Sequence, residues 1–163
     1  MSTNGSWSIS GARKHSGTYS YFSGYSNNLC AHVRTPSLNL TSGQSSTLTF
    51  WTAYNIYNNR DGGVVEISTN GGTSWSRLTP TPDYPGTFQN SSNQCGLTGN
   101  CFTNTNLTFT SYSVNLSAFN GQNVMIRWNF STNFNNTAEG WYVDDISITH
   151  VTQQSACSGT PAD

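Results

Sequence analysis

The feature that most constrains this chain is a two-residue alternation of apolar and polar side chains, which recurs without any comparable helical period. One run places Leu48, Phe50 and Tyr54 on the same side, and another does so with Ile126 and Trp128. Successive side chains of a strand point to opposite faces of a sheet, so the pattern predicts strands with one buried face. We expect strands at residues 17–23, 29–34, 36–40, 46–56, 63–69, 74–79, 107–116, 123–131 and 140–150.

Turn-forming sequences such as Asn70-Gly71-Gly72 and Asn120-Gly121 separate these runs, because glycine and asparagine tolerate positive φ. The pattern therefore predicts an all-β sandwich of two sheets. The length of 163 residues suits one domain. We assign residues 1–152 to this domain and residues 153–163, where the strand pattern has ended, to a C-terminal linker or tail.

The charge content excludes several classes of function. Only 8% of the residues are charged, and the net charge is −1. No basic stripe is present, which argues against nucleic-acid binding, and no segment has the length and hydropathy for membrane insertion.

The four cysteines, Cys30, Cys95, Cys101 and Cys157, allow three disulfide connectivities. The simplest pairs Cys95 with Cys101 and Cys30 with Cys157. Zinc is the alternative, although no Cys-x-x-Cys pair is present. Disulfides predict an oxidising, extracellular location. Because no secretory signal follows Met1, we interpret the chain as a domain excised from a larger exported protein.

Two adjacent acids interrupt the apolar strand Gly140–Ile148. Whichever face of this strand is buried carries either Asp144 or Asp145, and a buried carboxylate needs hydrogen bonds, a cation or a metal. Asp144 shares its face with two isoleucines, which favours a metal there. Asp61, before Gly62-Gly63, either caps a turn or binds Ca²⁺, which prefers such oxygen ligands. The predicted metal ligands are Asp144, Asp61 and Asp145.

Several aromatic side chains are candidates for stacking on a sugar ring, with ordinary core or edge packing as the alternative. Trp51 faces the polar side of its strand, and the others are in loops or at a strand start: Tyr57, Tyr84 and Tyr142. Trp75 ends a sequence similar to the Asp-box hairpin, in which Asn70 is expected to bond turn amides. We expect Trp75 and Trp128 in the core.

No catalytic motif is present, so no catalytic residues are predicted. Glu66 and Glu139 are the candidates for a glycosidase carboxylate pair, which requires a separation that the sequence does not reveal. The irregular segment 79–105 is interpreted as an excursion stapled by a disulfide, or alternatively as a ligand-contacting loop.

Several motifs in order resemble the MAM-like jelly-roll domains attached to immune inhibitor A-type (M6) proteases and, more distantly, the cleaved-adhesin domains of gingipains. These motifs are Ser16–Tyr19, Thr35–Leu40, Leu48–Trp51, Asp61–Ser68, Tyr112–Leu116 and Gly140–Ile148. The resemblance implies an antiparallel two-sheet jelly roll, with a structural calcium for which Asp144 is the leading ligand.

It also implies a non-catalytic, extracellular accessory or adhesion domain. The expected partners are a glycan or protein ligand at the cell surface and other domains of the parent chain. The alternatives are a carbohydrate-binding module and a self-assembling filament subunit.

Overall fold

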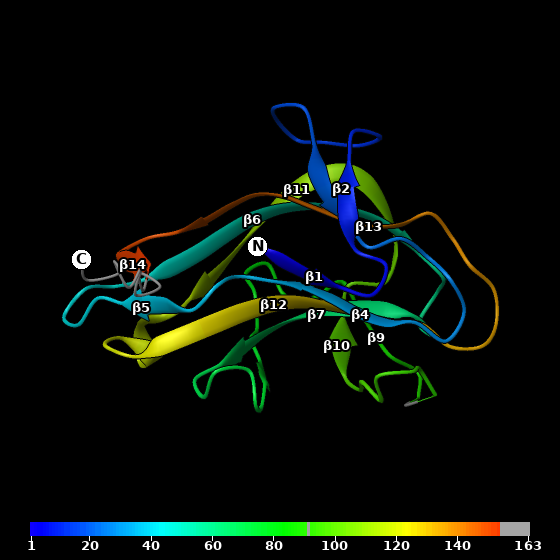
Figure 1. The fold of residues 1–163 in the computed structure, drawn as a ribbon. Coiled ribbons are helices and arrows are strands. Elements are labelled where there is room, and N and C mark those ends of the chain that lie inside the picture. The colour runs from blue at the N-terminus through cyan, green and yellow to red at the C-terminus, as the bar shows by residue number, and fades with distance from the viewer. Residues whose placement is uncertain (91, 154–163) are drawn as a thin grey trace, which may run out of the picture.

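The computed structural model describes residues 1–90 and 92–153, which form two antiparallel sheets packed face to face (Figure 1). The first sheet has seven strands: β1 (Ser2–Asn4), β4 (Cys30–Arg34), β5 (Leu38–Leu40), β7 (Gly62–Ser68), β8 (Ser76–Arg77), β12 (Asn123–Ser131) and β14 (Val151–Gln153). The second has five: β2 (Ser8–Ser10), β3 (Ser20–Phe22), β6 (Thr47–Ile56), β11 (Asn104–Asn115) and β13 (Gly140–Ile148). The all-β jelly-roll sandwich is thus confirmed.

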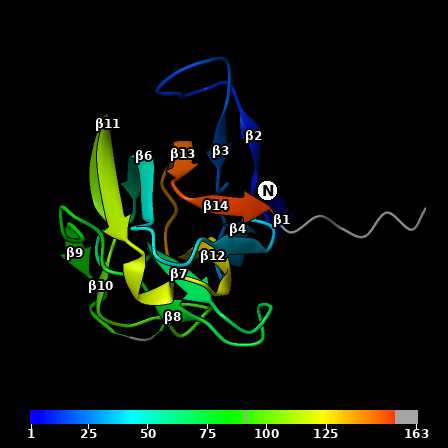
Figure 2. The same cartoon turned by 90° about the vertical axis from the view of Figure 1, so that its left-hand side faces the viewer.

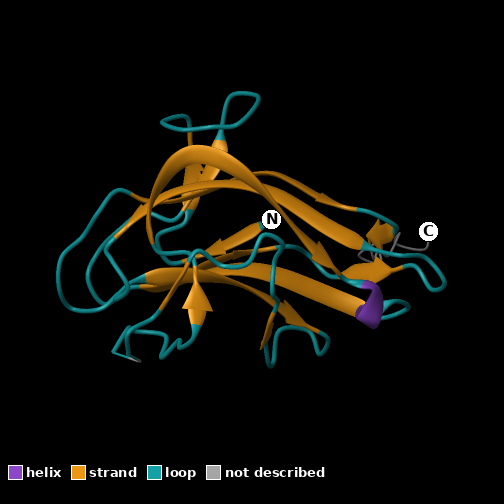
Figure 3. Cartoon of the chain, turned by 180° about the vertical axis from the view of Figure 1, so that it is seen from behind, coloured by secondary structure: helices purple, strands orange, loops and turns teal. Residues whose placement is uncertain are grey.

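Two small elements complete the fold. A separate two-stranded ribbon pairs β9 (Gly86–Thr87) with β10 (Asn100–Cys101). The one helical element in the described part of the chain is a 3₁₀ turn at Ser117–Phe119, which is purple in Figure 3. None of the helical structure in that part is long and apolar enough to cross a bilayer.

The long alternating segments were predicted well, because each buries every second side chain against the opposite sheet. Strand β12 coincides with the predicted range 123–131. The missed strands β1, β2 and β14 are three residues each, too short to show a period. Strand β14 also extends one residue past the predicted domain boundary, to Gln153. Residues 154–163 lie outside the described part, so the tail stays a prediction.

Aromatic side chains dominate the core between the sheets. Phe50, Trp128 and Trp141 are fully buried, as is Phe102, which lies just after β10. The ring of Phe102 is 4.9 Å from that of Tyr112 and 5.4 Å from that of Trp141, centroid to centroid. The irregular segment 79–105 therefore contributes to the core as well as to the surface.

The disulfide differs from the predicted pairing: Cys30 bonds to Cys95 across 65 residues. Cys101 is a buried free thiol, and Cys157 lies outside the described residues. Cys95 belongs to a loop that hydrogen-bonds to the end of β12, where its amide donates to Ser131 Oγ at 2.8 Å. Cys30 begins the neighbouring strand β4, so the fold brings these two cysteines together. The prediction that a disulfide fastens segment 79–105 is confirmed, but Cys95 pairs with Cys30 and not with Cys101.

Candidate functional site

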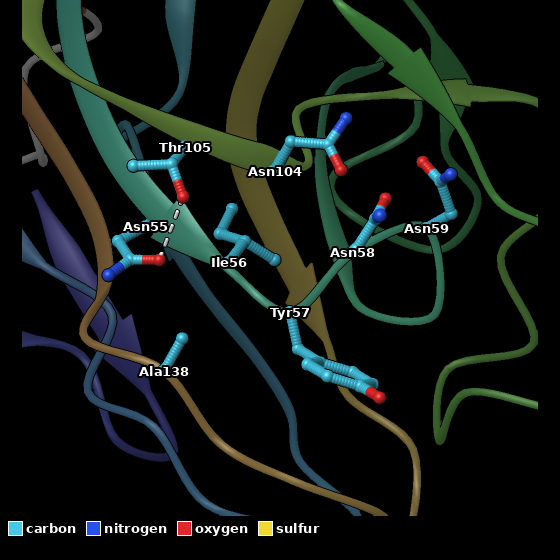
Figure 4. Close-up of a pocket in the computed structure, with 8 residues that line it drawn as sticks. All are labelled: Asn55, Ile56, Tyr57, Asn58, Asn59, Asn104, Thr105 and Ala138. Atoms are coloured by element: carbon cyan, nitrogen blue, oxygen red, sulfur yellow. Dashed lines mark hydrogen bonds between the residues drawn. The ribbon is translucent and has the colours of Figure 1, made fainter.

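An open pocket of about 700 Å³ lies where β6 ends and β11 begins (Figure 4). Six of its eight lining residues carry a side-chain amide or hydroxyl group, one of them a tyrosine. The eight are Asn55, Ile56, Tyr57, Asn58, Asn59, Asn104, Thr105 and Ala138. In the view of Figure 4, Asn58, Asn59 and Asn104 lie on one side of the pocket and Asn55, Thr105 and Ala138 on the other. The pocket thus offers neutral hydrogen-bonding groups and one aromatic ring.

Local backbone conformation shapes this pocket. Asn59 and Asn104 have positive φ, 56° and 69°, a conformation that asparagine adopts more readily than most residues. Thr105 Oγ1 donates to Asn55 Oδ1 at 3.0 Å. The side-chain amides of Asn58 and Asn104 make no hydrogen bond within the described residues. These two amides are therefore free to bond a ligand.

Asp61 holds the loops beneath the pocket together. Its carboxylate is fully buried; Oδ2 accepts a hydrogen bond from Tyr25 Oη at 2.5 Å, and Oδ1 accepts the amide of Asn133 at 2.7 Å. Tyr25 Oη in turn accepts the amide of Tyr57 at 2.9 Å. Burial raises the pKa of Asp61 above its ordinary value, although both bonds favour the charged form. Asp61 thus ties the Tyr57 loop to the loop that carries Ala138.

The acids of β13 hold a different part of the chain, the loop between β2 and β3. Asp144 is 8% exposed, and its Oδ2 accepts the backbone amides of His15 at 2.7 Å and Ser16 at 3.2 Å. Its Oδ1 accepts the amide of Asp145 at 2.7 Å. Asp145 is exposed, with φ of 44° at a β-bulge, and bonds Ser16 Oγ and His15 Nδ1, both at 2.6 Å. Both acids therefore act as a clasp.

These hydrogen bonds make Asp61 and Asp144 unfavourable ligands for calcium. Each oxygen of Asp61 and Asp144 faces an N–H or O–H donor, whose positive end opposes a cation. Within the part of the chain that the structure describes, Asp61 and Asp144 also share no hydrogen-bonding partner. Among the described residues, no group of three or more His, Cys, Asp or Glu side chains gathers as a metal centre. Calcium binding stays a prediction, and the hydrogen bonds account for the buried acids without it.

Of the aromatic candidates, only Tyr57 lines the large pocket. The ring of His15 stacks on Trp51 at 3.6 Å between centroids, and so covers one face of the indole. Tyr84 is 8% exposed, and its hydroxyl donates to the carbonyl of Leu78 at 2.7 Å. Tyr142 is 2% exposed. The expectation that a ligand reaches Tyr84 and Tyr142 is corrected: both are packed in the structure.

The remaining tryptophans divide between core and surface. Trp128 is fully buried, as predicted. Trp75 is only half-buried, so its core assignment is corrected. The hairpin before it has the expected bonds, since Asn70 Oδ1 accepts the amide of Ser74 at 2.9 Å.

The candidate glycosidase carboxylates are separated by the fold. Glu66 lies on β7 of the first sheet and bonds Arg127 Nε at 2.6 Å. Glu139 precedes β13 of the second sheet, and its Oε2 accepts from Arg13 Nη2 at 3.0 Å. Each acid bonds its own arginine, and among the residues that the structure describes no contact is shared between them.

Sequence reasoning missed the amides of the pocket and the partners of the clasp. The Asn58-Asn59 pair before a turn was an available signal for the pocket. For His15 and Ser16 no signal existed, because they lie 129 and 128 residues from Asp144 in the chain.

The model of the immune inhibitor A-like MAM domain family matches residues 3–158, and the chain belongs to this family. No curated protein matches the chain. Among solved structures, TmCBM61 in complex with β-1,4-galactotriose is similar, with a TM-score of 0.52 and 14% sequence identity. The alignment covers 91% of this chain and 86% of that one, and it shows a common sandwich fold.

Proposed function

We propose that this domain is a non-catalytic, extracellular accessory module that binds a neutral glycan in the pocket at the ends of β6 and β11. The observation that carries the proposal is the amide lining of this pocket, in which Asn58 and Asn104 keep their side-chain hydrogen-bonding groups free. Sugar hydroxyls bond well to amides, and a tyrosine ring such as Tyr57 can pack on the apolar face of a sugar. The similar carbohydrate-binding module, solved with a galactotriose, supports the same class of ligand.

The location and the accessory role rest on two further observations. The Cys30–Cys95 disulfide is typical of proteins that fold in an oxidising compartment. The family is that of a domain of immune inhibitor A-like proteins, which supports attachment to other domains of a parent chain.

Calorimetric titration with neutral oligosaccharides tests the proposal, starting with β-1,4-galactotriose and extending to other linkages. We expect Tyr57→Ala to weaken binding about 5- to 30-fold, since the loss of one packed aromatic contact is worth about 1 to 2 kcal/mol. Tyr19→Ala is the matched control, because Tyr19 is 61% exposed and is not among the pocket residues. Binding that survives Tyr57→Ala, or an absence of binding to a broad neutral glycan panel, would remove the proposal.

Adhesion through a protein surface is the second candidate. Ile9 and Tyr19 are 66% and 61% exposed and flank a small hollow of about 180 Å³ beside β2, an edge strand. Exposed apolar side chains at a sheet edge favour association, including self-assembly into filaments. Light scattering at rising concentration distinguishes this candidate, because growth in mass that Ile9→Ser abolishes would support it.

A further inference from the structure

A row of charged side chains crosses the outer face of the first sheet. Strand pairing sets Arg34 opposite Arg127, Arg127 opposite Glu66, and Glu66 opposite Arg77, across β4, β12, β7 and β8. Figure 1 shows β4, β12 and β7 together in the lower layer. The neighbouring positions along these strands are buried between the sheets: Val33, Val65 and Trp128. By alternation, the charged row faces away from the core.

This row is unbalanced in charge. It holds three of the six Lys and Arg residues of a chain whose net charge is −1. Glu66 is its one acid; its side chain is 9% exposed, and it bonds Arg127 Nε at 2.6 Å and Asn129 Nδ2 at 3.2 Å. No carboxylate stands between Arg34 and Arg127, and like charges directly opposite each other destabilise a sheet. An anion between these two arginines would relieve that repulsion.

Hydrogen-bond donors remain for such an anion. Arg34 donates through Nε to Ser2 Oγ at 3.1 Å and through Nη1 to Met125 Sδ at 3.9 Å. Its Nη2, and both terminal nitrogens of Arg127, have no acceptor within the described residues. Arg34 also lines a cavity of about 290 Å³ together with Met1, Ser2, Thr35, Pro36 and Met125. A ligand can therefore approach the Arg34 guanidinium directly.

The positive charges of Arg34 and Arg127 also affect the pKa of a neighbouring histidine. His32 lies on β4, one pairing step from the row, opposite Asn129. Burial lowers its pKa first, and the charges of Arg127 and Arg34 lower it further, with Glu66 acting weakly against them.

We infer that Arg34 and Arg127 form a second binding site, distinct from the amide pocket, for the carboxylate or sulfate groups of an acidic polysaccharide. A guanidinium presents a planar fork of donors that matches such groups. An aromatic ring and apolar side chains flank the pair: Arg127 stacks on Trp75 at 4.3 Å, and Pro36 and Met125 line the cavity. A sugar ring that carries an anionic group presents the charge and an apolar ring face together, which matches the arginines and their flanking side chains.

Titration of the full chain at low salt with polygalacturonate and with dextran sulfate tests this inference and distinguishes carboxylate from sulfate. We expect Arg34→Gln to weaken binding about tenfold, the effect of losing a charge-assisted hydrogen bond. Arg127→Lys keeps a charge beside Glu66 but loses the fork, and it should weaken binding similarly. Lys14→Gln is the matched control, because it removes one positive charge from an exposed residue on the other sheet's loop.

Four outcomes would overturn the inference. They are no binding of either polymer, unchanged binding by Arg34→Gln and Arg127→Lys, an equal loss from Lys14→Gln, and equally tight binding of polyglutamate, which would indicate a protein partner. Melting curves of each variant establish that it is folded. Tyr57→Ala should bind the acidic polymers like the parent, so failure here is distinguishable from failure of the neutral-glycan proposal.

Discussion

Two segments extend from the two sheets, and different kinds of interaction attach each of them to the sandwich. The loop between β2 and β3, residues 11–19, rises above the second sheet (Figure 1) and is held by the carboxylates of Glu139, Asp144 and Asp145. Figure 2 shows the same loop at the top of the view, beyond the ends of β2 and β3. Segment 79–103 lies on the opposite side and is held by the disulfide and by buried rings such as Phe88 and Phe102. The first attachment depends on protonation, whereas the second depends on redox state and apolar burial.

The two attachments also differ in what they position. The carboxylate clasp places His15 on Trp51 and leaves Tyr19 exposed. The stapled segment contacts one end of the charged row on the outer face of the first sheet, where Arg77 Nη1 donates to the carbonyl of Asn100 at 3.0 Å. Losing one attachment should therefore affect one surface and spare the other.

The largest expected effect is the loss of the disulfide. Replacing both Cys30 and Cys95 by serine releases a loop of 65 residues, and the chain-entropy model predicts a loss of about 4 kcal/mol in the free energy of unfolding. Urea denaturation of the parent and the double variant measures it. Reductant should lower the parent's midpoint and leave the variant's unchanged; coincident parent and variant midpoints would contradict the role of the staple.

A smaller loss is expected from Asp144→Ala. The change removes the acceptor of three backbone amides at a site that is 8% exposed. Each unsatisfied donor costs about 1 kcal/mol or more, so we expect a loss of about 3 kcal/mol. Asp144→Asn is the matched control, because its one remaining acceptor oxygen should retain part of the stability. The variants are compared by thermal and urea unfolding.

The same melts, with chelator-treated protein and added calcium, decide the metal prediction. The predicted structural calcium requires the parent's midpoint to rise, whereas an Asp144 satisfied by its amide donors alone requires the midpoint to stay unchanged. A rise in the parent that Asp144→Ala abolishes would instead establish calcium binding, since a ligand of the folded state raises stability by mass action.

The smallest effect is a pH dependence confined to the clasp. Hydrogen bonds from Ser16 and then His15 hold the pKa of Asp145 below its ordinary value, and the Arg13 guanidinium does the same for Glu139. A lowered folded pKa contributes stability above the unfolded pKa, about 4, and this contribution is lost as pH falls through the folded value. The stability difference between the parent and Asp145→Asn should therefore shrink below about pH 4.

The double variant in which serine replaces Cys30 and Cys95 serves as the comparison for the pH experiment. Its clasp is intact, so Asp145→Asn should produce the same pH-dependent difference in that background. Asp61 acts in the opposite direction, because burial raises its pKa and its protonation at low pH favours the folded state. A difference between parent and Asp145→Asn that does not change with pH would show that Asp145 holds the loop without its charge.

Local sequence patterns predicted the structure well wherever the burial of a strand depends on its own alternation of side chains. The alternation in 123–131 located β12, and the Asn70 hairpin formed the expected bonds. The apolar strand with two acids correctly indicated that Asp144 is buried and needs partners. Of the candidate pocket, only Tyr57 was predicted. The adjacent Asn58 and Asn59 were an available signal, whereas a single asparagine such as Asn104 in an amide-rich chain gives no sign of facing a cavity.

The sequence by itself determined the all-β class, the long strands and the family, since these depend on side-chain period and on motifs in order. Only the tertiary structure decided the disulfide partners, the hydrogen bonds of the three aspartates and the alignment of Arg34 with Arg127. Each of these joins residues distant in sequence, and such contacts depend on the register and layering of whole sheets. Period-two patterning fixes which face a side chain takes, but it does not fix which distant strand becomes its neighbour.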